Sequence, residues 1–289
     1  MSNQEYNNNN NNRGLGWIPD PPDFRDQYFH VTQPGLLEKL PPSVDLRQSE
    51  AMKFPIFDQG NLGSCTANAI SAAIAYAYYK QAMNNNITTT PTTTTPIISP
   101  FYIGSRLFIY YNERVSLNTV NSDSGAILRD GIKSVNRKGV CKEDPTWPYN
   151  INKFTQKPPS QAYSEASLHQ ALQYRRIDNS QLDQLKACLA QGFPFVFGFT
   201  VYSSFMTQAM AKTGMMPMPA KTEKVMGGHA VLGVGYDDVR KVFIVRNSWG
   251  SGWGDKGYFY MPYNYITNLD LSTDFWTVTM MEAEKTVQK

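Results

Sequence analysis

The segment that decides the fold is QGNLGSC at residues 59–65, which continues directly into CTANAISAAIAYAYYKQAM at residues 65–83. The second stretch contains neither Gly nor Pro, and its Ala and Tyr residues recur at helical spacing. This pattern predicts a long, mostly buried helix that begins at Cys65, after a turn with two glycines. A thiol at a helix N-terminus faces the positive end of the dipole and unpaired N–H groups, which lower its pKa. Cys65 is therefore a candidate nucleophile, although a small cysteine that opens a core helix is more often structural.

Patterning outside this segment predicts helices first and strands later along the chain. Two further helices are expected at residues 124–138 and 181–191, because each ends before a glycine. Four short segments rich in β-branched and aromatic residues are expected as strands, at residues 193–201, 229–236, 242–247 and 257–261. This order indicates an α+β protein with a helical lobe and a sheet lobe, and the cleft between them is the expected active site.

Composition excludes several classes of protein. Of the 289 residues, 41% are hydrophobic and 13% aromatic, which is enough for a sizeable core. The net charge of +3 is too small to indicate nucleic acid or an anionic membrane as partner, and no run of about 18 apolar residues occurs. The polar N-terminus has no secretory signal, so an intracellular location is the default expectation. The three cysteines form no CxxC pair, and we expect no disulfide framework, no metal and no cofactor.

Low-complexity segments predict the domain organisation. Residues 1–39 combine an Asn run at 7–12 with a Pro-rich stretch, so an Asn-rich tail and an extended leader, a possible propeptide, are expected. The main domain is expected at residues 40–289, after a second Pro pair. Within it, the Asn- and Thr-rich residues 84–96 predict a mobile surface insertion.

A thiolate that performs acyl transfer needs a proton carrier, and near neutral pH this is usually a histidine. His30 lies in the Pro-rich leader, and His169 lies in a polar stretch. His229 instead opens an apolar, strand-like segment after two glycines, which allow another segment to approach the imidazole. A lone histidine in a strand is more often structural, so His229 is a candidate that needs a partner.

The third element is NSWGSGWG at residues 247–254, at the end of another apolar strand. The side-chain oxygen of Asn247 can accept a hydrogen bond from an imidazole and fix its rotation. The indole of Trp249 can shield that bond from water. Taken alone, the segment could equally be a glycine-rich aromatic turn.

Together these motifs resemble the papain family of cysteine peptidases. The matching stretches are DQGNLGSC at 58–65, GHAV at 228–231 and NSWG at 247–250, in the family's order, and SVDLR at 43–47 resembles the family's mature N-terminus. The resemblance therefore covers roughly residue 40 to the end. It implies a papain-like two-lobe fold, with a helical N-terminal lobe, an antiparallel β-barrel-like C-terminal lobe and the active site in the cleft.

The resemblance also implies a role for each matching residue. Cys65 is the nucleophile, His229 is the general acid and base, and Asn247 orients His229. Gln59 supplies an oxyanion-hole donor beside the Cys65 backbone N–H, and Trp249 covers the His229–Asn247 bond. The implied activity is that of an endopeptidase that hydrolyses proteins or peptides through a thioester acyl-enzyme.

The sequence departs from the family pattern beside the nucleophile. The family has a cysteine three residues before it and an aromatic residue after it, whereas this chain has Leu62 and Thr66. The missing cysteine removes the usual nearby disulfide, which favours the prokaryotic-type members that lack it. The glycine-rich substrate wall is matched less closely, and its candidates are Ser124, Gly125 and Gly228.

Two other activities and two roles of the leader stay open at this point. An acyltransferase or transpeptidase could use the same triad, because water and amines compete for one acyl-enzyme. A binding-only, inactive homologue is also conceivable, although all four chemical positions are intact. The leader, with apolar residues at Trp17, Ile18 and Phe24, is expected either to inhibit the enzyme from the cleft or to pack behind the sheet lobe.

Overall fold

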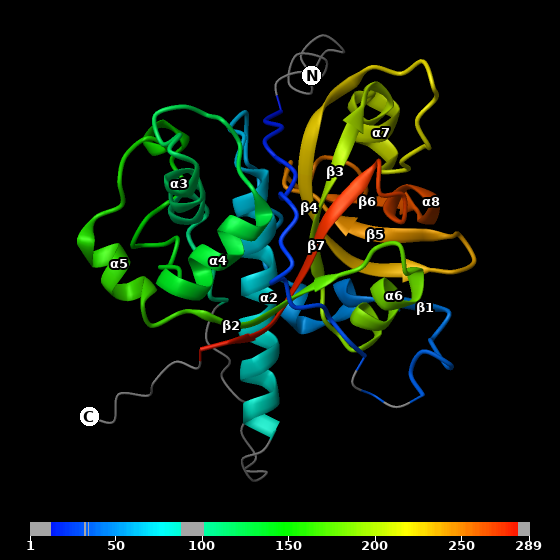
Figure 1. Cartoon of the computed structure of the whole chain (residues 1–289), viewed down its shortest axis with the longest axis horizontal. Coiled ribbons are helices and arrows are strands. Elements are labelled where there is room, and N and C mark those ends of the chain that lie inside the picture. The colour runs from blue at the N-terminus through cyan, green and yellow to red at the C-terminus, as the bar shows by residue number, and fades with distance from the viewer. Residues whose placement is uncertain (1–12, 32, 34, 88–100, 283–289) are drawn as a thin grey trace.

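Helix α2 (Cys65–Ile87) forms the centre of the molecule, with helices on one flank and the sheet on the other (Figure 1). The structure is a computed structural model that describes residues 13–31, 33, 35–87 and 101–282. Every residue of α2 up to Ala77 is buried, because small alanine side chains let both flanks pack against it. Residues 84–87 continue this helix instead of belonging to the expected insertion, whose remaining residues, 88–96, lie outside the described ones.

Shorter helices lie on both sides of α2. The helical side holds α3 (Arg106–Leu117), α4 (Leu128–Lys138) and α5 (Ser160–Ala166), and the sheet side holds α6 (Leu182–Ala190), α7 (Gln208–Thr213) and α8 (Tyr263–Ile266). Single 3₁₀ turns occupy Leu46–Gln48, Glu50–Met52, Ile151–Lys153 and Ser203–Met206.

The helix predicted at residues 124–138 begins only at Leu128. The preceding residues are extended or in turns, and Gly125 has a φ of +74°, which a helix does not allow. Helix α3 is absent from the sequence predictions. Its polar residues Asn112, Glu113 and Arg114 are buried, so its sequence does not alternate between apolar and polar faces.

The sheet has seven antiparallel strands in the order β2-β7-β3-β4-β5-β6, and β1 pairs with β4. The strands are β1 (Ser43–Asp45), β2 (Ala171–Ile177), β3 (Phe195–Tyr202), β4 (Val225–Asp237), β5 (Val242–Arg246), β6 (Tyr258–Pro262) and β7 (Ser272–Met281). The α+β class is as expected. Across the described residues, however, the sheet does not close into a barrel, since β2 and β6 stay at its two ends.

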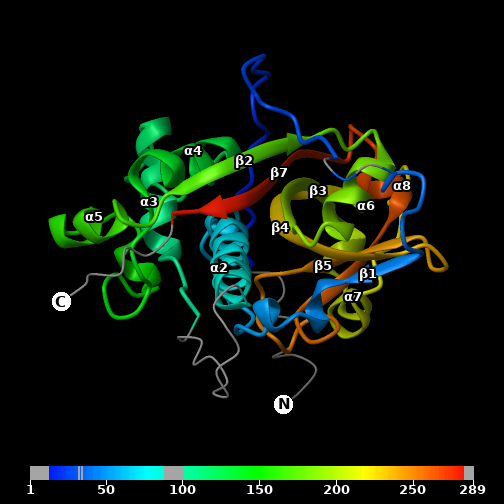
Figure 2. The same ribbon diagram turned by 90° about the horizontal axis from the view of Figure 1, so that it is seen from below.

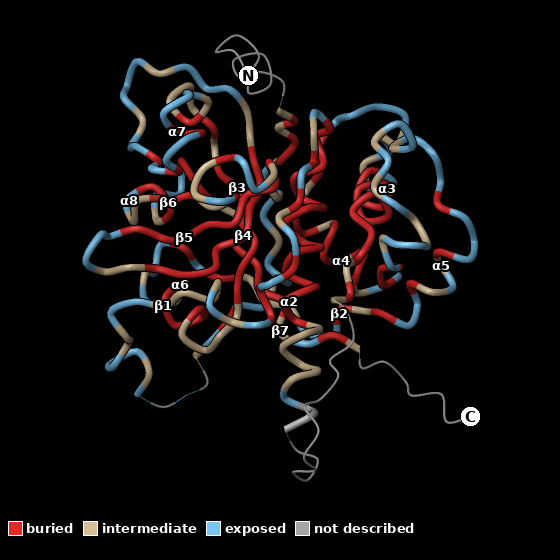
Figure 3. The backbone as a smooth tube through the Cα atoms, turned by 180° about the vertical axis from the view of Figure 1, so that it is seen from behind, coloured by how far each residue is buried: buried red, intermediate tan, exposed pale blue. Residues whose placement is uncertain are grey.

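Two hydrophobic cores flank the sheet. One contains the buried face of α2, the helical side and Trp17 of the leader. The other is an aromatic cluster on the sheet side, built around Phe197 and Phe199. Figure 3 shows the buried backbone along α2 and the central strands, and Figure 2 shows β2 and β7 running side by side past α2.

The leader runs between the two sides of the molecule (Figure 1, dark blue). Trp17 bridges to Ala126 on the helical side, and Tyr28 bridges to Arg176 in β2. Trp17 and Phe29 are both buried, so the leader contributes to both cores. In the part of the chain that the structure describes, no helix is long and apolar enough to cross a membrane.

Candidate active site

Cys65 is the first residue of α2 and is completely buried. Its thiol faces backbone N–H groups of Ala230, Gly16 and Thr66. Burial nevertheless raises the pKa of Cys65 to about 11, and these N–H groups offset only part of that effect. The lowered pKa expected from the helix N-terminus is therefore wrong for this closed arrangement, because the leader excludes the water that would solvate a thiolate.

His229 and Asn247 meet at the centre of the sheet side. The Nε2 atom of His229 lies 2.8 Å from Oδ1 of Asn247, which also accepts the Ser248 backbone N–H at 2.8 Å. An amide oxygen only accepts, so Nε2 carries the hydrogen and Nδ1, which is buried without a partner, keeps its lone pair. Burial lowers the pKa of His229 to about 4, with a smaller opposing effect of the Asn247 bond. Histidine and cysteine are thus both neutral while the leader covers them.

Aromatic rings hold the imidazole in place. The Trp249 ring lies over His229 with ring centroids 4.9 Å apart and an interplanar angle of 33°. Phe199 meets the same imidazole edge-on at 5.8 Å. Trp249 is almost fully buried, and its ring covers one face of the imidazole.

Gln59 presents its amide N–H groups at the start of α2. Its Nε2 donates to the carbonyl oxygen of Gly14 in the leader at 3.0 Å and to that of Leu62 at 2.8 Å. The hydroxyl of Ser248 donates to Oε1 of Gln59 at 2.6 Å, which fixes which way the amide faces. Sequence reasoning missed Ser248, because nothing but its place beside Asn247 marks it.

The two departures from the family pattern have structural explanations. Leu62 is buried, and its carbonyl accepts from Gln59. Thr66 points into the helical side, where its hydroxyl donates to Glu113 at 2.9 Å. Burial raises the pKa of Glu113 to about 8 despite that bond, so its carboxyl is mostly neutral at pH 7.

The leader occupies the cleft with its backbone. Ala126 donates to the Gly16 carbonyl at 2.7 Å, and Ile18 donates to the Ala126 carbonyl at 2.9 Å. From the opposite side, the Gly228 carbonyl accepts from the Trp17 N–H at 3.1 Å. The leader therefore bonds to both walls of the cleft, in the way a bound peptide would.

Two glycines allow this close approach. A Cβ at Gly16 would lie 1.9 Å from the Gly63 carbonyl oxygen, and one at Gly14 would lie 2.1 Å from the Leu62 oxygen. Real Cβ atoms essentially never come within 3.0 Å of another heavy atom. Any other residue at either position would displace the leader from the cleft.

The Trp17 side chain packs against strands β3 and β4 of the sheet. Its indole lies against Gly198 and Gly228, where an added Cβ would meet the ring at 1.9 and 2.8 Å. Its Nε1 donates to Oδ2 of Asp274 in β7 at 3.1 Å. The sequence analysis named Trp17 as a leader residue that could reach the cleft, but it did not identify Asp274, which lies 257 positions away in the chain.

The structure separates the candidates for the substrate wall. Gly125 contacts the leader, because a Cβ there would lie 2.2 Å from the Gly16 oxygen. Ala126, which was not a candidate, makes the backbone bonds. The hydroxyl of Ser124 turns away and donates to Thr119 at 2.7 Å. Gly228, the third candidate, lies on the opposite wall.

Comparison with known proteins places this geometry in context. The chain matches the family model described as papain family cysteine protease over residues 115–278, a segment that includes His229 and Asn247 but not Cys65. It is 41% identical to an uncharacterized peptidase C1-like protein of Acanthamoeba polyphaga mimivirus, over 92% of this chain and 86% of that protein. It is 26% identical to Cysteine proteinase 1 of Entamoeba histolytica, over 77% of this chain and 64% of that one. Xylellain, a cysteine protease from Xylella fastidiosa, is 41% identical, with a TM-score of 0.80 over 93% of this chain and 97% of that structure.

Proposed function

Because this chain belongs to the papain family of cysteine proteases, we propose that it is an endopeptidase whose catalytic residues are Cys65, His229 and Asn247. The observation that carries the proposal is the bound leader. A peptide carbonyl, that of Gly14, accepts the Gln59 Nε2–H bond at 3.0 Å, and the next glycine covers the Cys65 thiol. A peptide backbone therefore already fits where the chemistry requires one.

In the proposed reaction, departure of the leader first lets water reach the site. The Cys65 proton then moves to Nδ1 of His229, which has the free lone pair, and a thiolate–imidazolium pair forms. The sulfur attacks the carbonyl carbon of the substrate, and the carbonyl π electrons move onto its oxygen. The Gln59 side chain and the Cys65 N–H hold that oxyanion, an interaction worth about 3–4 kcal/mol per donor in comparable sites.

Collapse of this intermediate breaks the C–N bond and leaves a thioester on Cys65. The imidazolium of His229 donates its Nδ1 proton to the leaving amine. Neutral His229 then removes a proton from water as the water oxygen attacks the thioester. The imidazolium returns that proton to the departing sulfur, so the carboxylic acid and the Cys65 thiol are released. Asn247 keeps the ring in one rotation throughout, because its oxygen holds Nε2–H.

The leader, in this proposal, is an inhibitory segment that blocks the site before activation. It occupies the Gln59 donor and the space above Cys65, and it bonds to both cleft walls. This geometry favours inhibition over the alternative that the leader packs only behind the sheet lobe, although Phe29 does bury itself in the sheet-side core.

One experiment tests the activity and the inhibition together. A chain beginning at Leu40 should cleave a dipeptide–coumarin substrate faster than the full chain, and an added peptide spanning residues 13–39 should inhibit it. Cys65→Ala should abolish turnover, whereas Cys141→Ala, at another buried cysteine, should preserve it. Equal activity of both chains with a lower melting temperature for the shorter one would contradict inhibition. Turnover by Cys65→Ala would contradict the catalytic assignment.

A further inference from the structure

A buried cluster of charges anchors the leader away from Cys65. Asp20 and Asp26 belong to the leader, Arg129 to α4, Arg176 to β2 and Asp274 to β7. The side chains of Asp20 and Asp274 are fully buried, and that of Arg176, the most accessible of the five, is only 19% exposed.

Asp26 is the carboxylate that the two arginines share. Its Oδ2 accepts from Arg129 at 2.6 Å and from Arg176 at 3.1 Å. The side-chain hydrogen bonds that the structure records for Arg129 go to the leader alone, to Asp26 and to the Pro21 carbonyl. Since an unpaired buried guanidinium is strongly unfavourable, the cluster stabilises the closed leader.

Asp20 and Asp274 crowd the opposite end of the cluster. Arg176 donates to both, at 3.4 Å to Asp20 and 3.2 Å to Asp274, so with Asp26 its one guanidinium serves three carboxylates. The backbone N–H of Asp20 donates to Oδ2 of Asp274 at 2.7 Å, and the indole of Trp276 donates to Asp20 at 2.9 Å.

The cluster therefore holds three carboxylates and two guanidiniums in a buried volume. A buried excess of one negative charge is unfavourable, and one added proton removes it. Burial, with the charge of Asp274 as the next cause, raises the pKa of Asp20 to about 6, above the ordinary value of 3.8. Once the leader leaves, Asp20 is hydrated and regains that ordinary value.

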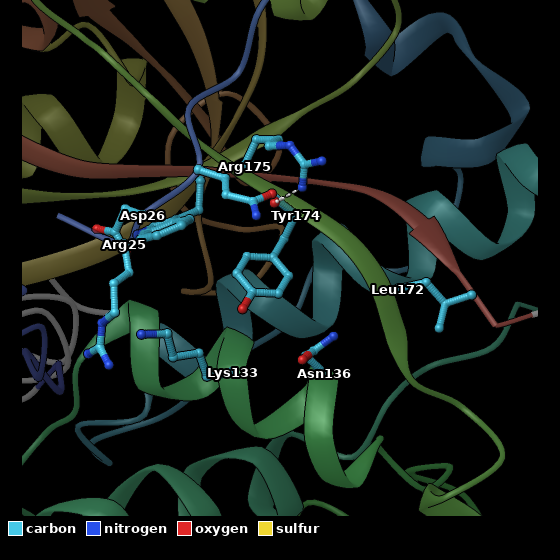
Figure 4. A pocket seen from close by; sticks show the side chains of 9 residues that line it. Arg25, Asp26, Lys133, Asn136, Leu172, Tyr174 and Arg175 are labelled. Carbon is cyan, nitrogen blue, oxygen red and sulfur yellow. Dashed lines mark hydrogen bonds between the residues drawn. The ribbon is translucent and has the colours of Figure 1, made fainter. Parts of the chain in front are cut away.

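Other charged groups border the cluster at the elements packed around it. They are Asp23 and Arg25 in the leader, Asp130, Lys133 and Arg137 in α4, and Arg175 in β2. Figure 4 shows Arg25, Lys133 and Arg175 around a cavity of about 250 Å³ that Asp26 and Trp276 also line.

We propose that these five residues form a pH-dependent latch, which holds the leader over Cys65 at acidic pH and loosens as the pH rises. The sign follows from linkage. A carboxyl whose pKa is higher in the closed state binds a proton on closing, so its stabilisation is present at low pH and is lost as the pH rises through about 6. The inference rests on the proposed inhibitory role of the leader, but it needs no proteolytic activity for its test.

The test measures the accessibility of Cys65 in the full chain. Alkylation by iodoacetamide, read by mass spectrometry between pH 5 and pH 8, is compared between the wild type and Asp20→Asn. Dividing the alkylation rate of the wild type by that of Asp20→Asn at each pH removes the effect of the Cys65 thiol's own ionisation, which is the same in both proteins. The Asp20 carboxyl has a pKa of about 6 when the leader is closed and 3.8 when it is open. The wild-type alkylation rate divided by the Asp20→Asn rate should therefore rise about tenfold between pH 5 and pH 8.

Two further variants control the interpretation. Asp23→Asn removes a leader carboxylate outside the cluster, which pairs with Arg25 and, at 3.4 Å, with Lys133 of α4. The Arg25 hydrogen bond lowers the pKa of Asp23, so this carboxyl does not titrate between pH 5 and pH 8 and the variant's ratio to the wild type should be flat. Asp274→Asn leaves the leader sequence intact and removes the same excess charge, so it should behave as Asp20→Asn does.

The possible results separate the two proposals. The latch is overturned if Cys65 alkylates slowly but the ratio of the wild-type rate to that of each cluster variant stays flat, or falls, as the pH rises. Either result leaves the inhibitory leader standing. Alkylation of the wild-type Cys65 as fast as that of an unfolded control at every pH would overturn both.

Discussion

Replacement of Gly16 by valine gives the most direct test of how the leader is held in the cleft. The first side-chain atom at this position would lie 1.9 Å from the Gly63 oxygen and 2.8 Å from the Gly63 Cα. The clash is with backbone that opens the catalytic helix, so the leader has to move by more than 1 Å. Gly16→Val should therefore open the leader without changing any catalytic residue.

The size of the effect follows from the bonds that such a shift breaks. The leader segment at residues 16–18 makes two hydrogen bonds to Ala126 and one to Gly228. At about 1 kcal/mol each, their loss amounts to roughly 3 kcal/mol, or on the order of a hundredfold in the open population. The Cys65 alkylation rate should rise by that factor at constant pH. Cys141 and Cys188, which are buried and distant in sequence, serve as internal references.

The matched control is Phe24→Ala. Phe24 belongs to the same leader but is 99% exposed, so its removal should leave the alkylation rate unchanged. If Gly16→Val alkylates no faster than the wild type, the close backbone approach at Gly63 does not hold the leader, and the reasoning fails. Equal acceleration of all three cysteines would instead indicate global unfolding.

Three further predictions concern the catalytic residues themselves. Gln59→Ala, compared in chains opened by Gly16→Val, should lower kcat about a hundredfold, and an unchanged kcat in steady-state kinetics would exclude Gln59 from the oxyanion hole. Thermal melting should also show a loss of about 1–3 kcal/mol of stability, because Ser248 loses its buried acceptor. Asn247→Ala should lower kcat by at least tenfold with little change in KM, because His229 loses the acceptor that fixes its rotation, and a change confined to KM would contradict that role. The pH profile of Cys65 alkylation should shift to lower pH when the leader opens, because burial in the closed arrangement raises the pKa of Cys65 to about 11. Identical profiles for the wild type and Gly16→Val would show that burial under the leader does not raise the thiol pKa.

The sequence by itself determined the features that depend on neighbouring residues. The Gly-free alanine run starting at Cys65 predicts α2 with its correct first residue, since helix formation responds to local composition and periodicity. The strands around His229 and Asn247 were also predictable, because their apolar, β-branched runs end at glycines or polar residues. The motifs identified the family, which the comparisons confirm, and they named the candidate catalytic residues, whose roles stay predictions until they are measured.

Only the tertiary structure decided what depends on residues far apart in the chain. The leader meets Gln59, Gly228 and Asp274 across separations as long as 257 positions, and no local pattern encodes such contacts. Helix α3 and strand β7 escaped prediction because their polar residues are buried against distant partners and interrupt the apolar period. The pKa values of Cys65 and His229 follow the same rule. The helix terminus favours a thiolate, but burial under a distant segment raises the thiol pKa more than the local N–H groups lower it.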